Sequence, residues 1–234
     1  MREIWPYLLP ILFLIAGLVL FFSLSTLISS PRVASLATLC AFIVFNFLVA
    51  KAFGWIKQIS STWSFQKVWH FIPGFLVGSL PIGASLIGYH FSSGIPPLKP
   101  VGILPLFFTL ITVSWEEAWF RGTPLEMASK AYSKIGAALL FGLIFSLLHL
   151  MNPKIDLLQD GLQLWVAGYT LSVCYFAFQS IWAAIGMHFA NNMIQALFGF
   201  SSEPRTWSFS ITLCLVALAL TLVVSRPPSF GPRT

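Results

Sequence analysis

Two adjacent glutamates and an arginine, Glu116, Glu117 and Arg121, follow the uncharged run 101–113. Placing one ionisable side chain near the centre of a bilayer costs roughly 3 kcal/mol or more on insertion scales, so two carboxylates in an apolar segment need a reason. Two later apolar segments each carry one histidine, His149 and His188. Asn192 follows His188 by one helical turn. Acid, base and amide groups in three neighbouring apolar segments predict a reaction centre.

If residues 101–121 form a helix, Glu117 and Arg121 share one face because they are four residues apart. The arginine can then hold this carboxylate ionised and neutralise it. Glu116 is rotated by about 100° and lacks such a partner, which makes it the better candidate for a group that exchanges a proton. The alternative is an ordinary surface salt bridge at a helix end in the cytoplasm.

The histidines also allow two interpretations. A single histidine such as His149 in an apolar helix is usually a hydrogen-bonded core residue. His188 and Asn192 are four residues apart and face one direction, and hydrocarbon cannot satisfy either group, so both must point into a helix bundle. They either form a site or join helices by polar contacts. Asn191 is expected to point elsewhere.

The composition identifies an integral membrane protein. Of 234 residues, 57% are hydrophobic and only 9% are charged, against about 25% charged in a soluble domain. The net charge is +6, but the basic residues form no run and lie at the ends of apolar segments, so no nucleic-acid partner is expected. The three cysteines lie in apolar stretches at unrelated spacings, which argues against disulfides and thiolate metal sites.

About 20 apolar residues span a bilayer. We expect an all-α, polytopic membrane helix bundle of about eight transmembrane helices, near residues 7–28, 33–53, 71–90, 101–121, 135–152, 162–179, 181–200 and 207–225. The first is too long for the apolar region of a signal peptide and is interpreted as a retained membrane helix. The sixth and seventh are joined by almost nothing, which predicts a tight antiparallel hairpin.

The distribution of basic residues predicts the orientation. One side of the membrane collects Arg2, Lys51, Lys57, Lys67, Arg121, Lys130, Lys134, Arg226 and Arg233. The other side holds Arg32, Lys99, Lys154 and Arg205. This asymmetry favours both termini in the cytoplasm. We expect the membrane to be the bacterial inner membrane.

Three motifs resemble, in order, those of the CAAX-protease and bacteriocin-processing (CPBP, type II CAAX) family of intramembrane endopeptidases. They are Glu-Glu-x-x-x-Arg at 116–121, Phe-x-x-x-His at 145–149 and His-x-x-x-Asn at 188–192. The resemblance covers roughly residues 100–200. It divides the chain into N-terminal membrane helices (1–100), a catalytic helical core (101–200), and a last membrane helix with a short basic tail (201–234).

The resemblance implies hydrolysis of a peptide bond in a membrane-associated substrate, with a prenylated CAAX-type substrate as one candidate. Glu116 and His149 would bind and deprotonate the water. His188 and Asn192 would donate to the oxyanion, and Glu117, Arg121 and Phe145 would be supporting residues. No cofactor is favoured. The rival arrangement places zinc on His149, His188 and Glu116, the ligand set of some catalytic zinc sites.

The segment after Arg121 is a departure from the family pattern. Thr123-Pro124-Leu125-Glu126 predicts a capping box that opens a new short helix. The depths of Glu116 and His149 in the membrane agree better if residues 123–133 also lie below the membrane surface. Non-helical backbone is allowed at that depth where it lines a wet cavity. Two other classes of function remain: a non-proteolytic membrane scaffold or chaperone, and a proton-coupled transporter.

Overall fold

The computed structural model describes residues 44, 48, 51, 63–94, 98–149, 157–198 and 207–226. The chain divides into two compact units, residues 1–61 and 62–234. The first two expected spans lie outside the described residues, apart from the helical positions 44, 48 and 51. The second unit contains all the candidate site residues.

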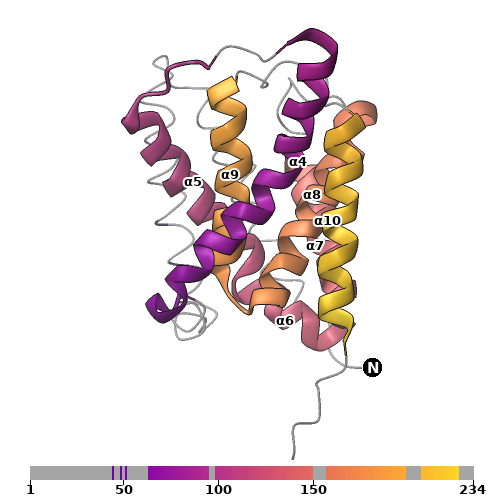
Figure 1. Cartoon of the computed structure of the whole chain (residues 1–234). Helices are drawn as coiled ribbons and strands as arrows, with labels where there is room; N and C mark the ends of the chain where they lie inside the picture. Colours follow the sequence, from indigo (N-terminus) through magenta and orange to yellow (C-terminus); the bar gives the residue numbers. More distant parts are fainter. Residues whose placement is uncertain are drawn as a thin grey trace, which may run out of the picture. The chain divides into compact units, whose positions relative to one another are not determined.

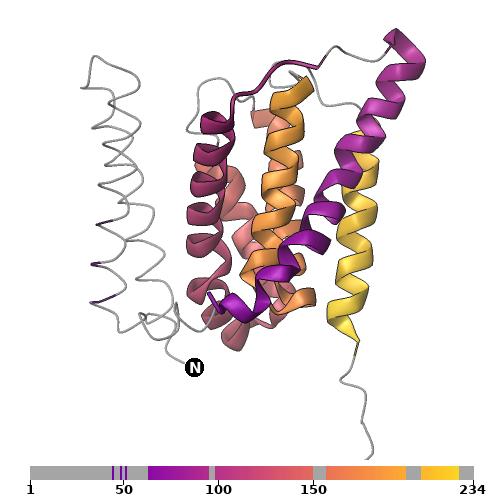
Figure 2. The same cartoon turned by 60° about the vertical axis from the view of Figure 1, so that its left-hand side comes forward.

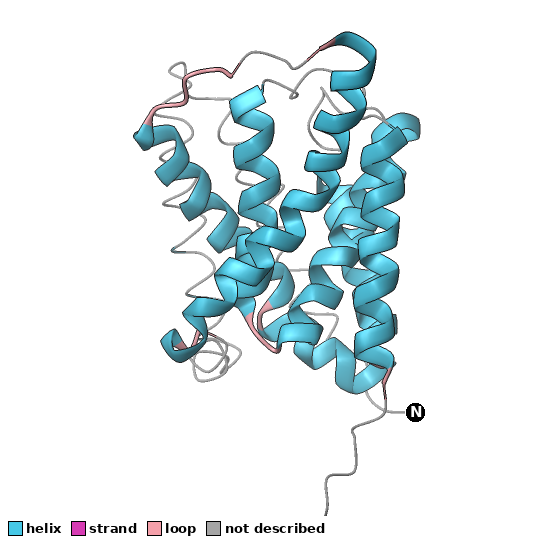
Figure 3. Ribbon diagram, in the orientation of Figure 1, coloured by secondary structure: helices cyan, strands magenta, loops and turns pink. Residues whose placement is uncertain are grey.

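In the described part of the second unit, all the regular secondary structure is helical (Figures 1 and 3). A short 3-10 helix, η1 (Phe65–His70), leads directly into the first long helix. The α-helices are α4 (Phe71–Ser93), α5 (Ile103–Arg121), α6 (Thr123–Tyr132), α7 (Lys134–His149), α8 (Leu157–Phe178), α9 (Ile181–Phe198) and α10 (Trp207–Ser225). The predicted all-α fold class is confirmed.

Six of the expected spans coincide, within a few residues, with α4, α5, α7, α8, α9 and α10. Among the described residues, three stretches are long and apolar enough to cross a membrane: Phe65–Phe91, Asp160–Phe178 and Ser208–Ser225. Lys134–His149 is a shorter apolar helix. The chain is therefore a helical membrane bundle, and the total of eight spans stays a prediction.

Glycines allow α4 and α9 to cross at close range (Figures 1 and 2). A Cβ atom on Gly74 would overlap the backbone carbonyl of Ala183, and one on Gly78 would overlap that of Met187. From the other side, a Cβ on Gly186 would overlap the carbonyl of Phe71. Small residues four apart let membrane helices approach closely. This contact presses α9, the helix that carries His188, against α4.

The segment between α5 and α7 is helical, which corrects the expectation of submerged non-helical backbone. Helix α6 starts after Gly122, which occupies the N-cap position without a side-chain cap hydrogen bond. The short helix was predicted correctly, but the capping box led by Thr123 was wrong. Leu125 is fully buried, and Tyr175 of α8 donates a hydrogen bond of 2.5 Å to Glu126. Helix α6 is thus packed into the bundle.

Only two residues, Gln179 and Ser180, separate α8 from α9, which confirms the predicted tight hairpin. Gln179 adopts the left-handed conformation with φ of 49°. Its carbonyl accepts a hydrogen bond of 2.6 Å from Lys67 Nζ in η1. The hairpin is therefore fixed to the start of α4, so that α9 begins at a defined register.

The glycine contact predicts an asymmetry between two Gly→Ala variants of α4. Gly74→Ala places a methyl group against the Ala183 carbonyl and is expected to destabilise the protein by about 1–3 kcal/mol, the usual cost of overpacking. Gly83→Ala is the matched control, because no atom lies within 4 Å of its Cβ position. Thermal unfolding in detergent should show a lower midpoint for Gly74→Ala alone. Equal midpoints for the two variants would contradict the close crossing.

Candidate active site

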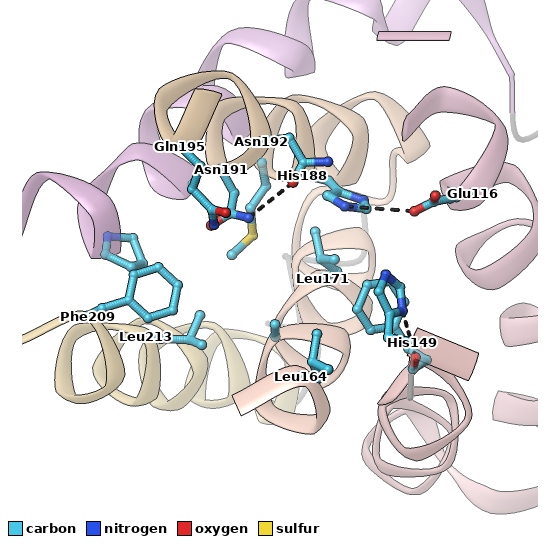
Figure 4. Close-up of a pocket in the computed structure, with 15 residues that line it drawn as sticks. Glu116, His149, Leu164, Leu171, His188, Asn191, Asn192, Gln195, Phe209 and Leu213 are labelled. Atoms are coloured by element: carbon cyan, nitrogen blue, oxygen red, sulfur yellow. Dashed lines mark hydrogen bonds and ion pairs between the residues drawn. The ribbon is translucent and has the colours of Figure 1, made fainter. Parts of the chain in front are cut away.

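A cavity of about 180 Å³ collects the four predicted catalytic residues (Figure 4). Glu116 projects from α5, His149 from α7, and His188 and Asn192 from α9. Most of the other lining residues are apolar and come from α4, α8, α9 and α10, among them Pro81, Leu164, Leu171, Met187, Phe209 and Leu213. Glu116 and His149 line the same cavity. The connection from α5 to α7 through the short helix α6 therefore places these two side chains at the same level of the bundle.

Behind the cavity lies a completely buried ion pair. Arg121 Nη1 donates to Glu117 Oε1 over 3.1 Å, and both side chains have 0% exposure. Arg121 Nη2 donates over 2.9 Å to the backbone carbonyl of Gly168 on α8. The predicted pairing is confirmed, and the surface salt bridge is excluded. Arg121 was wrongly counted among the loop charges, so the asymmetry of basic residues becomes eight to four.

His188 joins the ion pair to the cavity. Its Nδ1 lies 2.8 Å from Glu117 Oε1, and its Nε2 lies 3.8 Å from Glu116 Oε2. An ionised carboxylate only accepts hydrogen bonds, so Nδ1–H is the donor to Glu117. The bond between Glu117 and His188 was not predicted, because the motifs place these residues 71 positions apart.

The two glutamates therefore have different surroundings. Glu117 is fully buried between Arg121 and His188, whereas Glu116 keeps 30% of its side chain exposed and lines the cavity. This difference follows from the rotation of about 100° between neighbouring positions of a helix. Glu117 is held in place as a fixed charge, and Glu116 is free to meet water or a substrate.

His149 is oriented by its own helix. Its Nδ1 lies 2.8 Å from the carbonyl oxygen of Phe145. A carbonyl can only accept, so Nδ1 carries the proton, and in a neutral ring Nε2 is left as a hydrogen-bond acceptor. An acceptor nitrogen and the Glu116 carboxylate in one cavity are the groups that a general-base reaction requires.

Phe145 packs against the arginine and both histidines of the site. The Arg121 guanidinium carbon lies 4.7 Å from the centre of its ring, a distance suited to a cation–π interaction. The ring centres of His149 and His188 lie 4.1 Å and 5.9 Å away. Phe145 was predicted to be a supporting residue. In the structure its ring is the surface against which the Arg121 guanidinium and both imidazoles pack.

The motif analysis missed Gly168. A Cβ on this residue would lie 3.0 Å from the Gly142 Cα atom and 2.8 Å from the Phe145 Cβ atom. Only glycine lets α7 and α8 approach so closely and leaves the Gly168 carbonyl available to Arg121. Single glycines inside apolar helices, as at 142 and 168, are the sequence signal for such close approach.

Asn191 and Gln195 were also missed as cavity residues. Asn191 was expected to point away from the site, but both side chains line the cavity. Gln195 Nε2 donates to Asn191 Oδ1 over 3.1 Å, and Asn191 Nδ2 donates to Asn192 Oδ1 over 3.2 Å. Positions 188, 191, 192 and 195 follow the spacing of one helix face, which could have revealed the set.

The described residues include no group of three His, Cys, Asp or Glu side chains arranged to hold a metal ion. Glu116, His149 and His188 line one cavity but do not form such a group in this conformation. The zinc alternative stays a prediction for experiment.

Removing the buried arginine should destabilise the protein. Arg121→Ala leaves the Glu117 charge in an apolar interior without its main partner, which typically costs about 3–5 kcal/mol. Arg226→Ala is the control, because Arg226 is exposed just beyond α10. The thermal midpoint in detergent should fall for Arg121→Ala and stay near wild type for Arg226→Ala. A wild-type midpoint for Arg121→Ala would rule out a structural ion pair.

Residues 99–194 match the family described as type II CAAX prenyl endopeptidase Rce1-like. A curated relative, "CAAX prenyl protease 2" of Methanococcus maripaludis, is 28% identical over 162 residues, which cover 62% of this chain and 58% of the relative. The chain thus spans somewhat more than half the length of that relative. The matched segment contains every predicted catalytic residue and the buried ion pair, and it is a domain of the Rce1-like type II CAAX prenyl endopeptidase family.

Proposed function

We propose that this protein is an intramembrane endopeptidase that hydrolyses a peptide bond by means of a water molecule activated by Glu116 and His149. The observation that supports this most directly is the difference between two adjacent glutamates. Glu116 is 30% exposed and lines a cavity with two histidines, while Glu117 has 0% exposure beside Arg121. A structural polar cluster has no need of a second carboxylate facing a cavity.

The proposed reaction begins with water held between Glu116 and His149 Nε2. The water oxygen attacks the substrate carbonyl carbon, and its proton passes to Glu116. The tetrahedral oxyanion then collapses, the C–N bond breaks, and Glu116 returns the proton to the leaving amine. General-base assistance of this kind typically contributes about 10²–10⁴-fold to a rate.

Asn192 and His188 are the proposed donors to the oxyanion. Glu116, Glu117 and Arg121 together carry a net charge of −1 when ionised, and a protonated His188 makes the cluster neutral. Protonated His188 donates through Nδ1 to Glu117, 2.8 Å away, and its Nε2–H is available for the oxyanion. Donors fixed before the reaction stabilise the developing charge at little reorganisation cost.

The proposed substrate is a membrane-associated peptide of the CAAX type. The name of the curated relative, CAAX prenyl protease 2, suggests this class. The apolar lining from α8 and α10 suits aliphatic substrate side chains in contact with Leu164, Leu171 and Leu213. That the substrate carries a prenyl group and a CAAX-type sequence is part of this proposal.

We further propose that the membrane orientation follows the corrected eight-to-four asymmetry, with both termini and Lys130 in the cytoplasm. Lys130 lies exposed on α6, and position 156 would face the outside. In a background without native cysteines, an impermeant thiol reagent applied to intact cells should label a cysteine at position 156 and spare one at 130. The reverse pattern would invert the orientation.

Glu116→Gln should abolish cleavage while the fold persists, because the amide keeps the shape but cannot take a proton from water. We expect kcat on a fluorogenic prenylated CAAX peptide to fall by about 10²–10⁴-fold with an unchanged thermal midpoint. Glu117→Gln should lower the midpoint, because it leaves Arg121 without a charge partner. Glu126→Gln is the control outside the cavity. Wild-type activity in Glu116→Gln would rule out Glu116 as the general base.

The same assay separates metal-free from zinc-dependent hydrolysis. Under the proposed mechanism, wild-type activity survives prolonged dialysis against a chelator, and the dialysed protein contains no stoichiometric zinc. Activity that disappears with the chelator and returns with added Zn²⁺ would instead favour the zinc-dependent mechanism, with His149, His188 and Glu116 as the candidate ligands.

A further inference from the structure

Three side-chain amides form a hydrogen-bonded chain along the cavity face of α9 (Figure 4). Asn191, Asn192 and Gln195 are all partly buried and all line the cavity. They continue the stripe that begins at His188, since they follow it by three, four and seven residues. Apart from Glu116 and the two histidines, the rest of the lining is apolar or glycine, so these amides depend largely on one another for hydrogen bonds.

The chain of amides has a direction. Gln195 Nε2 donates to Asn191 Oδ1, and Asn191 Nδ2 donates to Asn192 Oδ1. A primary amide has an accepting oxygen and a donating NH₂ group. Because the Asn192 oxygen is occupied as an acceptor, its NH₂ group is the end left free. Within the described ranges, Asn192 Nδ2 has no hydrogen-bond partner.

The orientation of Asn192 decides whether it helps or hinders the proposed reaction. An NH₂ group stabilises an oxyanion, whereas a carbonyl oxygen in the same place repels it. The two orientations differ by a half-turn of an amide of almost unchanged shape, so packing alone discriminates poorly between them. A directional hydrogen bond to one end of the amide does discriminate.

We propose that Asn191 and Gln195 are positioning residues that hold Asn192 with its NH₂ group toward the reacting carbonyl. The inference rests on the proposed function of Asn192 as an oxyanion donor. Asn191 acts directly through its hydrogen bond to Asn192, and Gln195 acts one step further away by fixing the amide of Asn191. The catalytic donor is thus set by a relay of three amides on one helix.

Substitutions at Asn191 test the relay because they change whether the side chain at this position can donate a hydrogen bond to Asn192. In Asn191→Asp the new carboxylate can only accept, so Asn192 must turn its NH₂ group toward it and present its oxygen to the cavity. We expect kcat to fall by about 100-fold or more, the cost of losing one oxyanion donor, with KM nearly unchanged. Asn191→Leu leaves Asn192 free to rotate and should cost less, and Gln195→Leu should cost least.

The order of these variants separates the relay from a pure charge effect and from a purely structural role of the amides. If the added charge alone mattered, the uncharged Asn191→Leu would retain the wild-type kcat, and that result would overturn the relay. If the amides only joined helices, the loss would appear as a lower thermal midpoint. The relay predicts wild-type midpoints for the two uncharged variants, Asn191→Leu and Gln195→Leu, and effects confined to kcat.

A spectroscopic measurement tests the relay without proteolysis. In detergent-solubilised full-length protein with ¹⁵N-labelled asparagine, the side-chain NH₂ signals of Asn192 are identified by their absence in Asn192→Asp. They should shift in Asn191→Leu, Asn191→Asp and Gln195→Leu, and stay in place in Arg226→Ala. Unshifted signals would overturn the relay even if the enzyme is active. Shifted signals in a protein that cleaves no peptide would support the relay and contradict the proposed function.

Discussion

The buried pair of Glu117 and Arg121 is the constraint on which the site depends. Two charges with 0% exposure must find their partners within the protein, because an uncompensated charge there costs several kcal/mol. Arg121 contacts Glu117, the Gly168 carbonyl and the Phe145 ring, and Glu117 also accepts from His188. These contacts bring α5, α7, α8 and α9 together around one guanidinium group.

Fixing Glu117 also determines what Glu116 can do. The next residue on a helix points about 100° away, so once Glu117 is turned into the bundle, Glu116 is turned toward the cavity. His188 contacts both carboxylates, with Nδ1 near Glu117 and Nε2 near Glu116. The buried carboxylate and the one that lines the cavity are therefore both in contact with a single imidazole, and a shift of α9 relative to α5 would disturb both contacts.

The sequence predicted those parts of the site that depend on spacing within one helix. The i, i+4 rule identified Arg121 as the partner of Glu117. Hydropathy identified the six expected spans that fall within the described residues. Contacts between helices were less accessible. The acceptor at Gly168 is a backbone carbonyl, which every residue type possesses, so no motif marks it. The bond from His188 to Glu117 joins positions 71 residues apart. Asn191 was misplaced because only the i, i+4 pair of His188 and Asn192 was considered, although a residue three positions after His188 lies on the same helix face.

Helix α9 shows how a membrane protein can hold several polar groups in one helix. It is packed against α4, α5 and α8, and the overlap of a Cβ on Gly186 with the Phe71 carbonyl shows how close α4 lies. Its amides then satisfy one another within the cavity instead of facing hydrocarbon. A chain of three amides joined in one direction leaves, at one end, an NH₂ group that donates to no other amide of the chain. Here that end is Asn192, beside His188, so the arrangement that makes the polar helix tolerable also supplies the site with a hydrogen-bond donor.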